Sequence, residues 1–320
     1  MGIIRGITID DRWIDDRWIR EKRGRKNAVT PAKPYSFIVE KELMQSGKVE
    51  DVAIIFLTNS ECPFNCLMCD LWKNTTDTPV QPGEIPAQIL HALESLPAVK
   101  HIKLYNSGSF FDKRAIPAMD HEKIASILKD FETVILESHP LFINQGCIDF
   151  SKMIRGKLEI AIGLETINPE VTGILNKRMT LSLFRNTVTF LSENNISSRA
   201  FILVRPPFMT EDEGLYWAKK SIDFAFDSGV ECCSLIPVRP GNGAIDELMR
   251  SGHFNMPSII SLEKALEYGI SLKRGRVFAD TWDLKIFSTC DNCLNSRIER
   301  ITEMNLTQEV IPEVICGCGS

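Results

Sequence analysis

Residues 62–69 read CPFNCLMC and place Cys62, Cys66 and Cys69 on one short loop. The loop directly follows residues 52–57, an apolar run of the kind that forms a buried strand. Three thiolates this close together suit an iron–sulfur cube, because cysteine thiolates are the usual ligands of such clusters. Three protein ligands leave one iron of a [4Fe–4S] cube able to bind a small molecule. The alternatives are a zinc ion, although structural zinc usually has four protein ligands, and three incidental thiols.

Apolar strands alternate with amphipathic helices downstream of this loop. Besides residues 52–57, strands are expected at residues 99–105, 134–136, 158–164, 199–204 and 231–237. Apolar residues on one helical face predict helices at residues 86–96, 121–131, 181–194 and 212–228. This alternation is typical of parallel βα units. It predicts an α/β fold, a partial (βα)6 TIM-like barrel over residues 51–245, with an N-terminal extension (1–50) and a C-terminal extension (246–320).

Polar and glycine residues follow every one of the expected strands. The segments concerned are residues 58–65, 105–109, 137–140, 163–166, 205–207 and 239–243. In parallel βα folds, chemistry gathers at the carboxyl ends of the strands. A purely structural sheet has no need of ligand-capable groups at each of these ends. We therefore expect a functional site at this edge of the sheet.

The 320-residue chain is 44% apolar and 25% charged, which is ordinary for a globular protein and excludes disordered and collagen-like classes. The longest apolar run, residues 52–57, is far shorter than the roughly 20 residues of a membrane-spanning helix. The first residues, MGIIRG, show no apolar core of a secretory signal. No membrane association and a cytoplasmic location are therefore expected. Thiols stay reduced there, so clustered cysteines bind metal more often than they form disulfides.

The formal net charge is −5, but basic residues gather near the N-terminus. Residues 17–26 carry six cations against Glu21 alone: Arg17, Arg20, Lys22, Arg23, Arg25 and Lys26. Such an arm on an acidic body either meets a phosphate backbone or is simply a solvated segment. The sequence DDRWI occurs twice beside it, at residues 10–14 and 15–19. We expect its Trp13 and Trp18 to dock the arm on the body rather than to stack on bases.

A second cysteine group lies near the C-terminus and consists of Cys290, Cys293, Cys316 and Cys318. Four thiolates satisfy either a tetrahedral zinc ion or an auxiliary iron–sulfur cluster, and a group without metal is the third alternative. Apolar residues between the two pairs predict a small helix packed on the barrel. Three cysteines fit no ligand spacing and are expected to be buried as small apolar groups: Cys147, Cys232 and Cys233.

A C-x3-C-x2-C loop after the first strand of a (βα)6 sheet resembles the loop of the radical S-adenosylmethionine (radical SAM) enzymes. The resemblance covers about residues 51–245 and implies a [4Fe–4S] cluster held by Cys62, Cys66 and Cys69. It implies that the open iron binds the amino and carboxylate groups of S-adenosylmethionine. An electron from an external donor would split the sulfonium, and the 5′-deoxyadenosyl radical would take a hydrogen atom from the substrate. Met68 stands where the family often has an aromatic residue near the adenine.

The resemblance also implies further contacts to S-adenosylmethionine. In chain order these are Asn106, Ser107, Gly108, Glu137, Ser138, Glu165 and Arg178. The first three stand where the family has a glycine-rich turn whose backbone receives the methionine amino group. The next three follow strand ends, where they are placed to meet the ribose or the methionyl part. Arg178 is expected to pair with the methionine carboxylate, and the candidates for quenching the substrate radical are Tyr105 and Cys233.

Several stretches resemble one subgroup of radical SAM proteins, the archaeosine-forming lyases and, more distantly, the elongator catalytic subunit. They are YNSGSFFD (105–112), ESHP (137–140), GLET (163–166), LNKRMT (175–180), RPPFMTE (205–211) and GNGAIDELMRSGHF (241–254). Those proteins act on tRNA nucleosides, and the lyases carry a longer insert between their first two cluster cysteines than this chain does.

The acidic body fits a small substrate better than RNA. The first expectation is therefore a radical SAM oxidoreductase, lyase or transferase acting on a small metabolite or on a precursor of a cofactor or natural product. The alternative is modification of a tRNA nucleoside, which the subgroup resemblance and the basic arm favour. A third hypothesis is a non-catalytic binding protein stabilised by metal.

Overall fold

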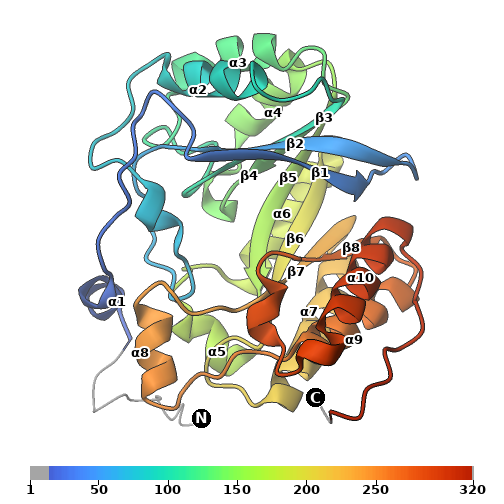
Figure 1. Ribbon diagram of the computed structural model, residues 1–320. Helices are drawn as coiled ribbons and strands as arrows, with labels where there is room; N and C mark the ends of the chain where they lie inside the picture. The colour runs from blue at the N-terminus through green and yellow to red at the C-terminus, as the bar shows by residue number, and fades with distance from the viewer. Residues whose placement is uncertain (1–13, 319–320) are drawn as a thin grey trace.

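The computed structural model describes residues 14–318, which form one eight-stranded sheet curled into a half-barrel (Figure 1). In sheet order the strands are β1 (Ser36–Leu43), β2 (Val49–Leu57), β3 (His101–Asn106), β4 (Thr133–Glu137), β5 (Lys157–Glu165), β6 (Ser197–Val204), β7 (Cys232–Pro237) and β8 (Arg276–Ala279). The helices are α1 (Asp16–Lys22), α2 (Glu84–Leu93), α3 (His121–Ile127), α4 (Gln145–Met153), α5 (Pro169–Ile174), α6 (Leu181–Glu193), α7 (Glu211–Asp227), α8 (Ala244–Arg250), α9 (Ile259–Ser271) and α10 (Asp291–Thr307). Within residues 14–318, no helix is both long and apolar enough to cross a membrane.

The six expected strands are β2 to β7, and they pair in parallel, which confirms the predicted α/β half-barrel. The sheet continues beyond the predicted core at both ends. β1 pairs antiparallel with β2, and β8 pairs in parallel with β7. Sequence patterns missed both strands because charged residues that face the barrel interior interrupt them: Glu40 and Glu42 in β1, and Arg276 in β8.

The two faces of the sheet are packed differently. The helix-facing side chains are fully buried in one large apolar core, for example Leu104, Leu136, Ile202 and Leu235, each 0% exposed. Helices α2 to α4 cover one part of this face and α6, α7 and α9 another (Figure 1). The inward face carries charged and aromatic residues instead. The apolar core therefore lies between the sheet and the helices, whereas the inward face presents polar and aromatic groups.

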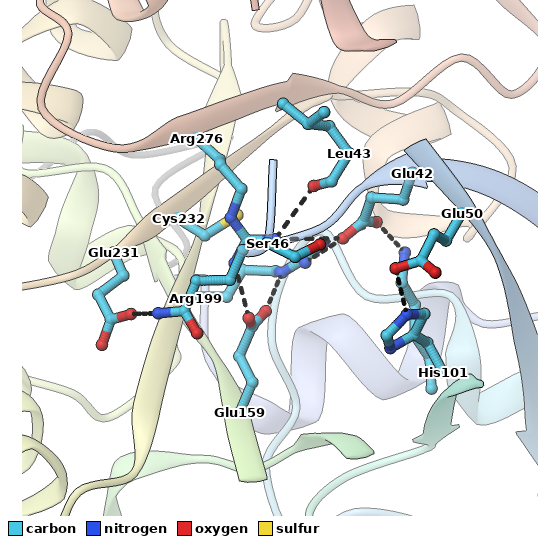
Figure 2. A network of polar contacts seen from close by, with 12 residues as sticks. Glu42, Leu43, Ser46, Glu50, His101, Glu159, Arg199, Glu231, Cys232 and Arg276 are labelled. Atoms are coloured by element: carbon cyan, nitrogen blue, oxygen red, sulfur yellow. Dashed lines mark hydrogen bonds and ion pairs between the residues drawn. The ribbon is translucent and has the colours of Figure 1, made fainter. Parts of the chain in front are cut away.

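Buried ion pairs close the amino-terminal end of the half-barrel (Figure 2). Arg199 donates from Nε to Glu159 Oε1 over 2.6 Å and pairs through its other nitrogens with Glu42. Arg276 donates from Nη2 to Glu159 Oε2 over 2.8 Å. Lys103 completes the set by pairing with Glu42. We call these five residues the floor network.

Charge complementarity keeps the floor network ionised. Burial alone would raise the pKa of Glu42, but Arg199 and Lys103 outweigh it and hold that pKa well below its usual range. Burial would likewise raise the pKa of Glu159, but Arg199 and Arg276 outweigh it and lower that pKa. Buried carboxylates tolerate such surroundings only when they are paired and hydrogen-bonded. The network thus depends on every one of its cations.

Helix α1 docks beside the cysteine loop and α8 (Figure 1). Trp18 is 8% exposed and Ile19 2% exposed, and both lie in one apolar cluster with Leu67 of the cysteine loop. Met68 packs against the same cluster. The prediction that Trp18 docks the arm is confirmed, whereas Trp13 lies outside the described residues.

Candidate functional site

Asparagine amides from distant parts of the chain hold the cysteine loop at the carboxyl end of β2. Asn242, which follows β7, donates from Nδ2 to the carbonyl oxygens of Leu67 (2.7 Å) and Cys69 (3.2 Å). Asn176, which follows α5, donates to the carbonyl oxygen of Asn65 over 2.8 Å. Loop carbonyls that would otherwise need water are thereby satisfied. The positions of the thiols consequently depend on residues more than 100 positions away.

The three loop thiols do not form one tight group of the kind that the C-terminal cysteines form. The Sγ atoms of Cys62, Cys66 and Cys69 are not a group in which all lie within 4.8 Å of one another. Thiolates on one tetrahedral zinc lie about 3.8 Å apart, since each zinc–sulfur bond is about 2.3 Å. Thiolates on different irons of a cube lie farther apart. A cluster at this loop therefore stays a prediction that rests on the spacing of the cysteines.

Burial raises the pKa of each of these three thiols to about 12. The positive charge of Lys177 offsets part of this rise at Cys66. Without metal the thiols are therefore protonated at neutral pH, and a metal or cluster must displace their protons when it binds. Such coupling is expected where thiols are metal ligands rather than nucleophiles.

The turn after β3 approaches the first cysteine closely. Gly108 has a φ of +120°, and a Cβ built on it would lie 3.3 Å from the Cys62 Cβ. Asn106 is 1% exposed, and neither of its side-chain polar atoms has a hydrogen-bond partner among the described residues. Asn106 pairs in register with Leu57 and lies two residues after Leu104, so its amide is on the helix side of the sheet, and Gly108 is the residue of this turn that meets Cys62. Ser107, 2% exposed, completes the turn, and its carbonyl accepts from Asn59 Nδ2 over 3.0 Å.

A buried ion pair between Glu165 and Lys177 lies beside the cysteine loop. Lys177 Nζ is 2.5 Å from Glu165 Oε1, and both lie over Gly163, where a Cβ would come within 2.1 Å of each. Burial would lower the pKa of Lys177, but Glu165 and then Cys66 raise it above its usual range. Lys177 therefore keeps its charge next to the thiols. Glu165 was predicted here from the sequence, and Lys177 was not.

The structure pairs Arg178 with α1. Its side chain is 54% exposed and pairs with Asp16 of α1. Asn176 and Arg178 both have positive φ values, 53° and 55°, so the chain turns tightly and neighbouring side chains diverge. The preceding residue, Lys177, acts on Cys66 by its charge, and so does Arg23. The adjacency of Lys177 and Arg178 in LNKRMT was the available signal, and sequence alone could not decide between them.

The other predicted residues divide between the interior and the core. Tyr105 and Glu137 lie on the inward face, and Ser138, 1% exposed, follows Glu137 at the strand end. Cys233 is 0% exposed in the apolar core on the helix side of β7, where the structure does not bring it to the cysteine loop. Cys147 and Cys232 are likewise buried, as predicted.

His139 supports the site as a neutral ring. Burial lowers its pKa to about 4. Its Nε2 lies 2.9 Å from the carbonyl oxygen of Lys177, and its Nδ1 accepts from the Leu141 backbone N–H over 3.2 Å. The ring also lies 4.3 Å, centroid to centroid, from Phe64 of the cysteine loop. These contacts fix the loop that carries Lys177 against the loop that carries the thiols.

The carboxyl of Glu137 has no hydrogen-bond or ion-pair partner among residues 14–318. Burial raises its pKa to about 8, although Lys177 opposes this rise. Because the folded pKa exceeds the unfolded value, ionisation of Glu137 opposes folding. This penalty grows as pH rises from about 4.5 to about 8 and is constant above that.

Glu137→Gln is therefore expected to stabilise the cofactor-free protein at pH 9 but not at pH 4.5. The gain is about 1–3 kcal/mol, discounted because the side chain is partly accessible to water. Urea unfolding at both pH values measures it, with substitution of an exposed glutamate, Glu303→Gln, as the matched control. An identical effect of Glu137→Gln at both pH values would contradict the assignment.

The four C-terminal cysteines converge as predicted from their spacing. All four Sγ atoms lie within 4.8 Å of one another, with Cys290 and Cys316 3.9 Å apart, and Cys293 and Cys318 also 3.9 Å apart. Arg297 donates from Nε to Cys293 Sγ over 3.3 Å. The predicted helix between the two pairs is α10 (Figure 1). The group could hold a metal ion.

Comparison with known structures identifies the fold. Archaeal Elp3 from Methanocaldococcus infernus, a radical SAM protein, superimposes with a TM-score of 0.51 at 12% identity, covering 79% of this chain and 63% of that one. The chain has the radical SAM fold. Coproporphyrinogen III oxidase from Escherichia coli, a radical SAM enzyme, gives a TM-score of 0.45 at 14% identity over 81% of this chain and 55% of that one. No model of a protein family matches the sequence.

Three archaeal proteins are similar in sequence to this radical SAM-fold chain. An uncharacterised protein of Methanocaldococcus jannaschii is 24% identical over 93% of this chain and 88% of that protein. Archaeosine synthase subunit beta of Thermococcus kodakarensis is 25% identical over 49% of this chain and 51% of the subunit. The same subunit of Methanosarcina acetivorans is 22% identical over 63% of this chain and 60% of the subunit. The chain thus matches between half and three-fifths of the archaeosine synthase subunits.

Proposed function

We propose that the protein is a radical SAM enzyme, with Cys62, Cys66 and Cys69 holding a [4Fe–4S] cluster and S-adenosylmethionine bound beside it. The observation that carries the proposal is the gathering of three thiols on one loop after β2, with Gly108 against Cys62 and the buried charge of Lys177 beside Cys66, inside a radical SAM fold. When bound, the cluster would supply the electron that cleaves the sulfonium of S-adenosylmethionine.

The chain's own groups would hold the cofactor in the following way. The turn of Asn106, Ser107 and Gly108, which approaches Cys62 through Gly108, would receive the methionine amino group on its backbone. Lys177 supplies the buried positive charge next to the thiols and takes the role that the sequence assigned to Arg178. Glu137, Ser138 and Glu165 remain the proposed contacts to the ribose and methionyl parts, and Tyr105 the proposed partner of the substrate radical.

A small metabolite, or a precursor of a cofactor or natural product, is the first proposed substrate class. Four of the six cations of the basic arm are engaged by acids of the protein itself. The pairs are Arg17–Glu21, Lys22–Glu247, Arg23–Glu61 and Lys26–Asp77. A phosphate backbone would have to compete with these contacts. The arm is thus better explained as a clamp on the cysteine loop than as an RNA-binding element.

A tRNA nucleoside is the second proposed substrate, because the sequence is similar to two archaeosine synthase beta subunits. The two proposals differ in an observable way. An enzyme that acts on tRNA requires tRNA for product formation and loses affinity steeply with added salt, whereas a metabolite enzyme does neither.

The test of the proposed chemistry is anaerobic reconstitution with iron and sulfide, followed by reduction in the presence of S-adenosylmethionine. Formation of 5′-deoxyadenosine and methionine is the expected result. A protein that binds a full complement of iron and yet forms neither product would be the non-catalytic binding protein instead.

We further propose that the four C-terminal cysteines hold one zinc ion rather than an auxiliary cluster. Their 3.9 Å contacts match the roughly 3.8 Å between thiolates on one tetrahedral zinc. All four also lie closer together than the loop thiols proposed for the cube. The ion would tie the end of the chain to α10 and stabilise this extension.

Cys293→Ser is expected to remove this zinc and to lower the unfolding free energy by several kcal/mol, because structural zinc binding is coupled to folding. Elemental analysis and thermal unfolding measure the two effects. Asn292→Ser, an exposed neighbour within the first pair, is the matched control and should retain the metal. Iron with acid-labile sulfide at this site, found in a variant that lacks Cys66, would contradict the zinc proposal.

A further inference from the structure

Aromatic side chains line the inward face of the sheet above the floor network. Strand register places Phe56 beside Tyr105 and Phe201 beside Ser234. Tyr105 and Phe201 lie two residues after Lys103 and Arg199, so they share the inward face with those floor residues. All three rings are partly exposed, whereas the helix-facing residues of the same strands are fully buried. The rings are therefore less closely packed than the core on the helix side of the sheet.

These rings form one continuous wall. The ring centroids of Tyr35 and Phe56 are 5.6 Å apart, those of Phe56 and Tyr105 6.1 Å, and those of Tyr105 and Phe201 6.1 Å. The indole of Trp282 adds a fifth ring, 5.4 Å from Phe56. Aromatic rings at such distances stabilise one another in tilted or edge arrangements and present flat apolar surfaces to a ligand.

Trp282 also bridges the two edges of the sheet. It follows β8, and its Nε1 donates to Glu40 Oε1 of β1 over 2.7 Å. β1 and β8 are the terminal strands of the sheet, and no ladder of the described strands joins them. The indole is 40% exposed. It is therefore an outer wall of the interior at the seam between the sheet edges.

The charges around this space disfavour an anion. The nearby cations are already paired with acids: Lys103, Lys177, Arg199, Arg239 and Arg276. The guanidinium groups of Arg199 and Arg276 also lie 5.5 and 6.0 Å from the ring of Phe278. By contrast, Glu40 and Glu137 have no ion-pair partner within residues 14–318. Such walls suit a flat, neutral or cationic group that donates hydrogen bonds.

We propose that the aromatic wall of Phe56, Tyr105 and Trp282 binds a planar heteroaromatic ring of the substrate, neutral or cationic. The inference rests on the proposed function, because it names the substrate class of the same site. The ring could be that of a free molecule or of a nucleoside within RNA. Both share this chemistry, and the experiment separates them.

The test is equilibrium dialysis of the full-length, anaerobically reconstituted protein against indole, adenosine and guanosine, with glutarate as an aliphatic anion. At least one ring compound is expected to bind more tightly than glutarate. Trp282→Ala should weaken this binding about tenfold, the effect of losing one stacking partner. Trp282→Phe should restore most of it. Tyr216→Ala removes an exposed ring on the outer helix α7 and should change nothing.

Two results would overturn the proposal: tighter binding of glutarate than of every ring compound, or ring binding that Trp282→Ala leaves unaltered. Thermal unfolding of each variant shows whether it is folded. An unmodified tRNA transcript is then added to compete with the bound ring compound. If it displaces that compound at concentrations where guanosine does not, the ring belongs to RNA. If the transcript does not compete, the ring belongs to a free molecule. Formation of 5′-deoxyadenosine without substrate, measured on the same wild-type sample, tests the proposed function separately, since it requires no ring binding.

Discussion

Cys66→Ala is expected to abolish both the visible absorbance of the reconstituted cluster and the formation of 5′-deoxyadenosine. Only Cys62 and Cys69 would remain to hold a cube, and the buried positive charge of Lys177 would face a methyl group instead of a thiolate. Removing a residue that only contacts a metal ligand already lowers metal affinity or activity about 10–100-fold. Removing a ligand itself is therefore expected to lower activity by more than about 100-fold. Iron content, absorbance and product analysis measure it.

Cys147→Ala is the matched control for this substitution. Cys147 is also buried, at 0% exposure, but it lies in the core between the sheet and the helices. Its truncation is expected to lower the unfolding free energy by about 1 kcal/mol and to leave iron binding intact. A Cys66→Ala protein with the full cluster spectrum would remove the cysteine loop as the cluster site and, with it, the proposed function.

Arg199→Leu is expected to have the largest effect on stability. Arg199 is 2% exposed and pairs closely with both Glu42 and Glu159, whereas Arg276 reaches Glu42 only over 3.7 Å. Removing one partner of a buried ion pair leaves an uncompensated charge and costs about 3–5 kcal/mol. The variant should therefore unfold at a much lower urea concentration than the wild type at pH 7.

The same measurement at low pH checks the cause. Arg199 helps to lower the pKa of Glu42, so this part of the stability is present above about pH 4.5 and is lost as pH falls further. The gap between wild type and Arg199→Leu should narrow at pH 4. Arg250→Leu, which removes an exposed partner of Glu247, should leave the unfolding free energy nearly unchanged at either pH. A gap that stays constant with pH would mean that packing, not charge, holds this end of the barrel together.

The order of the parallel strands was predictable because β2 to β7 are buried on the helix side and read as apolar runs. β1 and β8 were missed because charged residues on their inward face interrupt the apolar pattern. Their inward residues, such as Glu42 and Arg276, satisfy one another across the barrel and so look like surface residues in the sequence. A pattern method sees a charge but not the opposite charge that three-dimensional closure brings to it.

The candidate site was predictable where chemistry depends on spacing along the chain. The C-terminal thiols came together as their spacing predicts, and the turn of Asn106 and Gly108 met Cys62. Sequence could not show which of two adjacent cations faces the thiols, because the positive φ values around Lys177 decide it. Nor could it show that Asn242 holds the cysteine loop, since that contact spans 173 positions.

The contact between Asn242 and the cysteine loop also bears on biogenesis. During synthesis Cys69 leaves the ribosome long before Asn176 and Asn242 have been translated. Until those two amides arrive, the nascent loop lacks the anchors that space its sulfur atoms. We therefore expect the proposed cluster to be inserted after near-completion of the polypeptide rather than during its elongation.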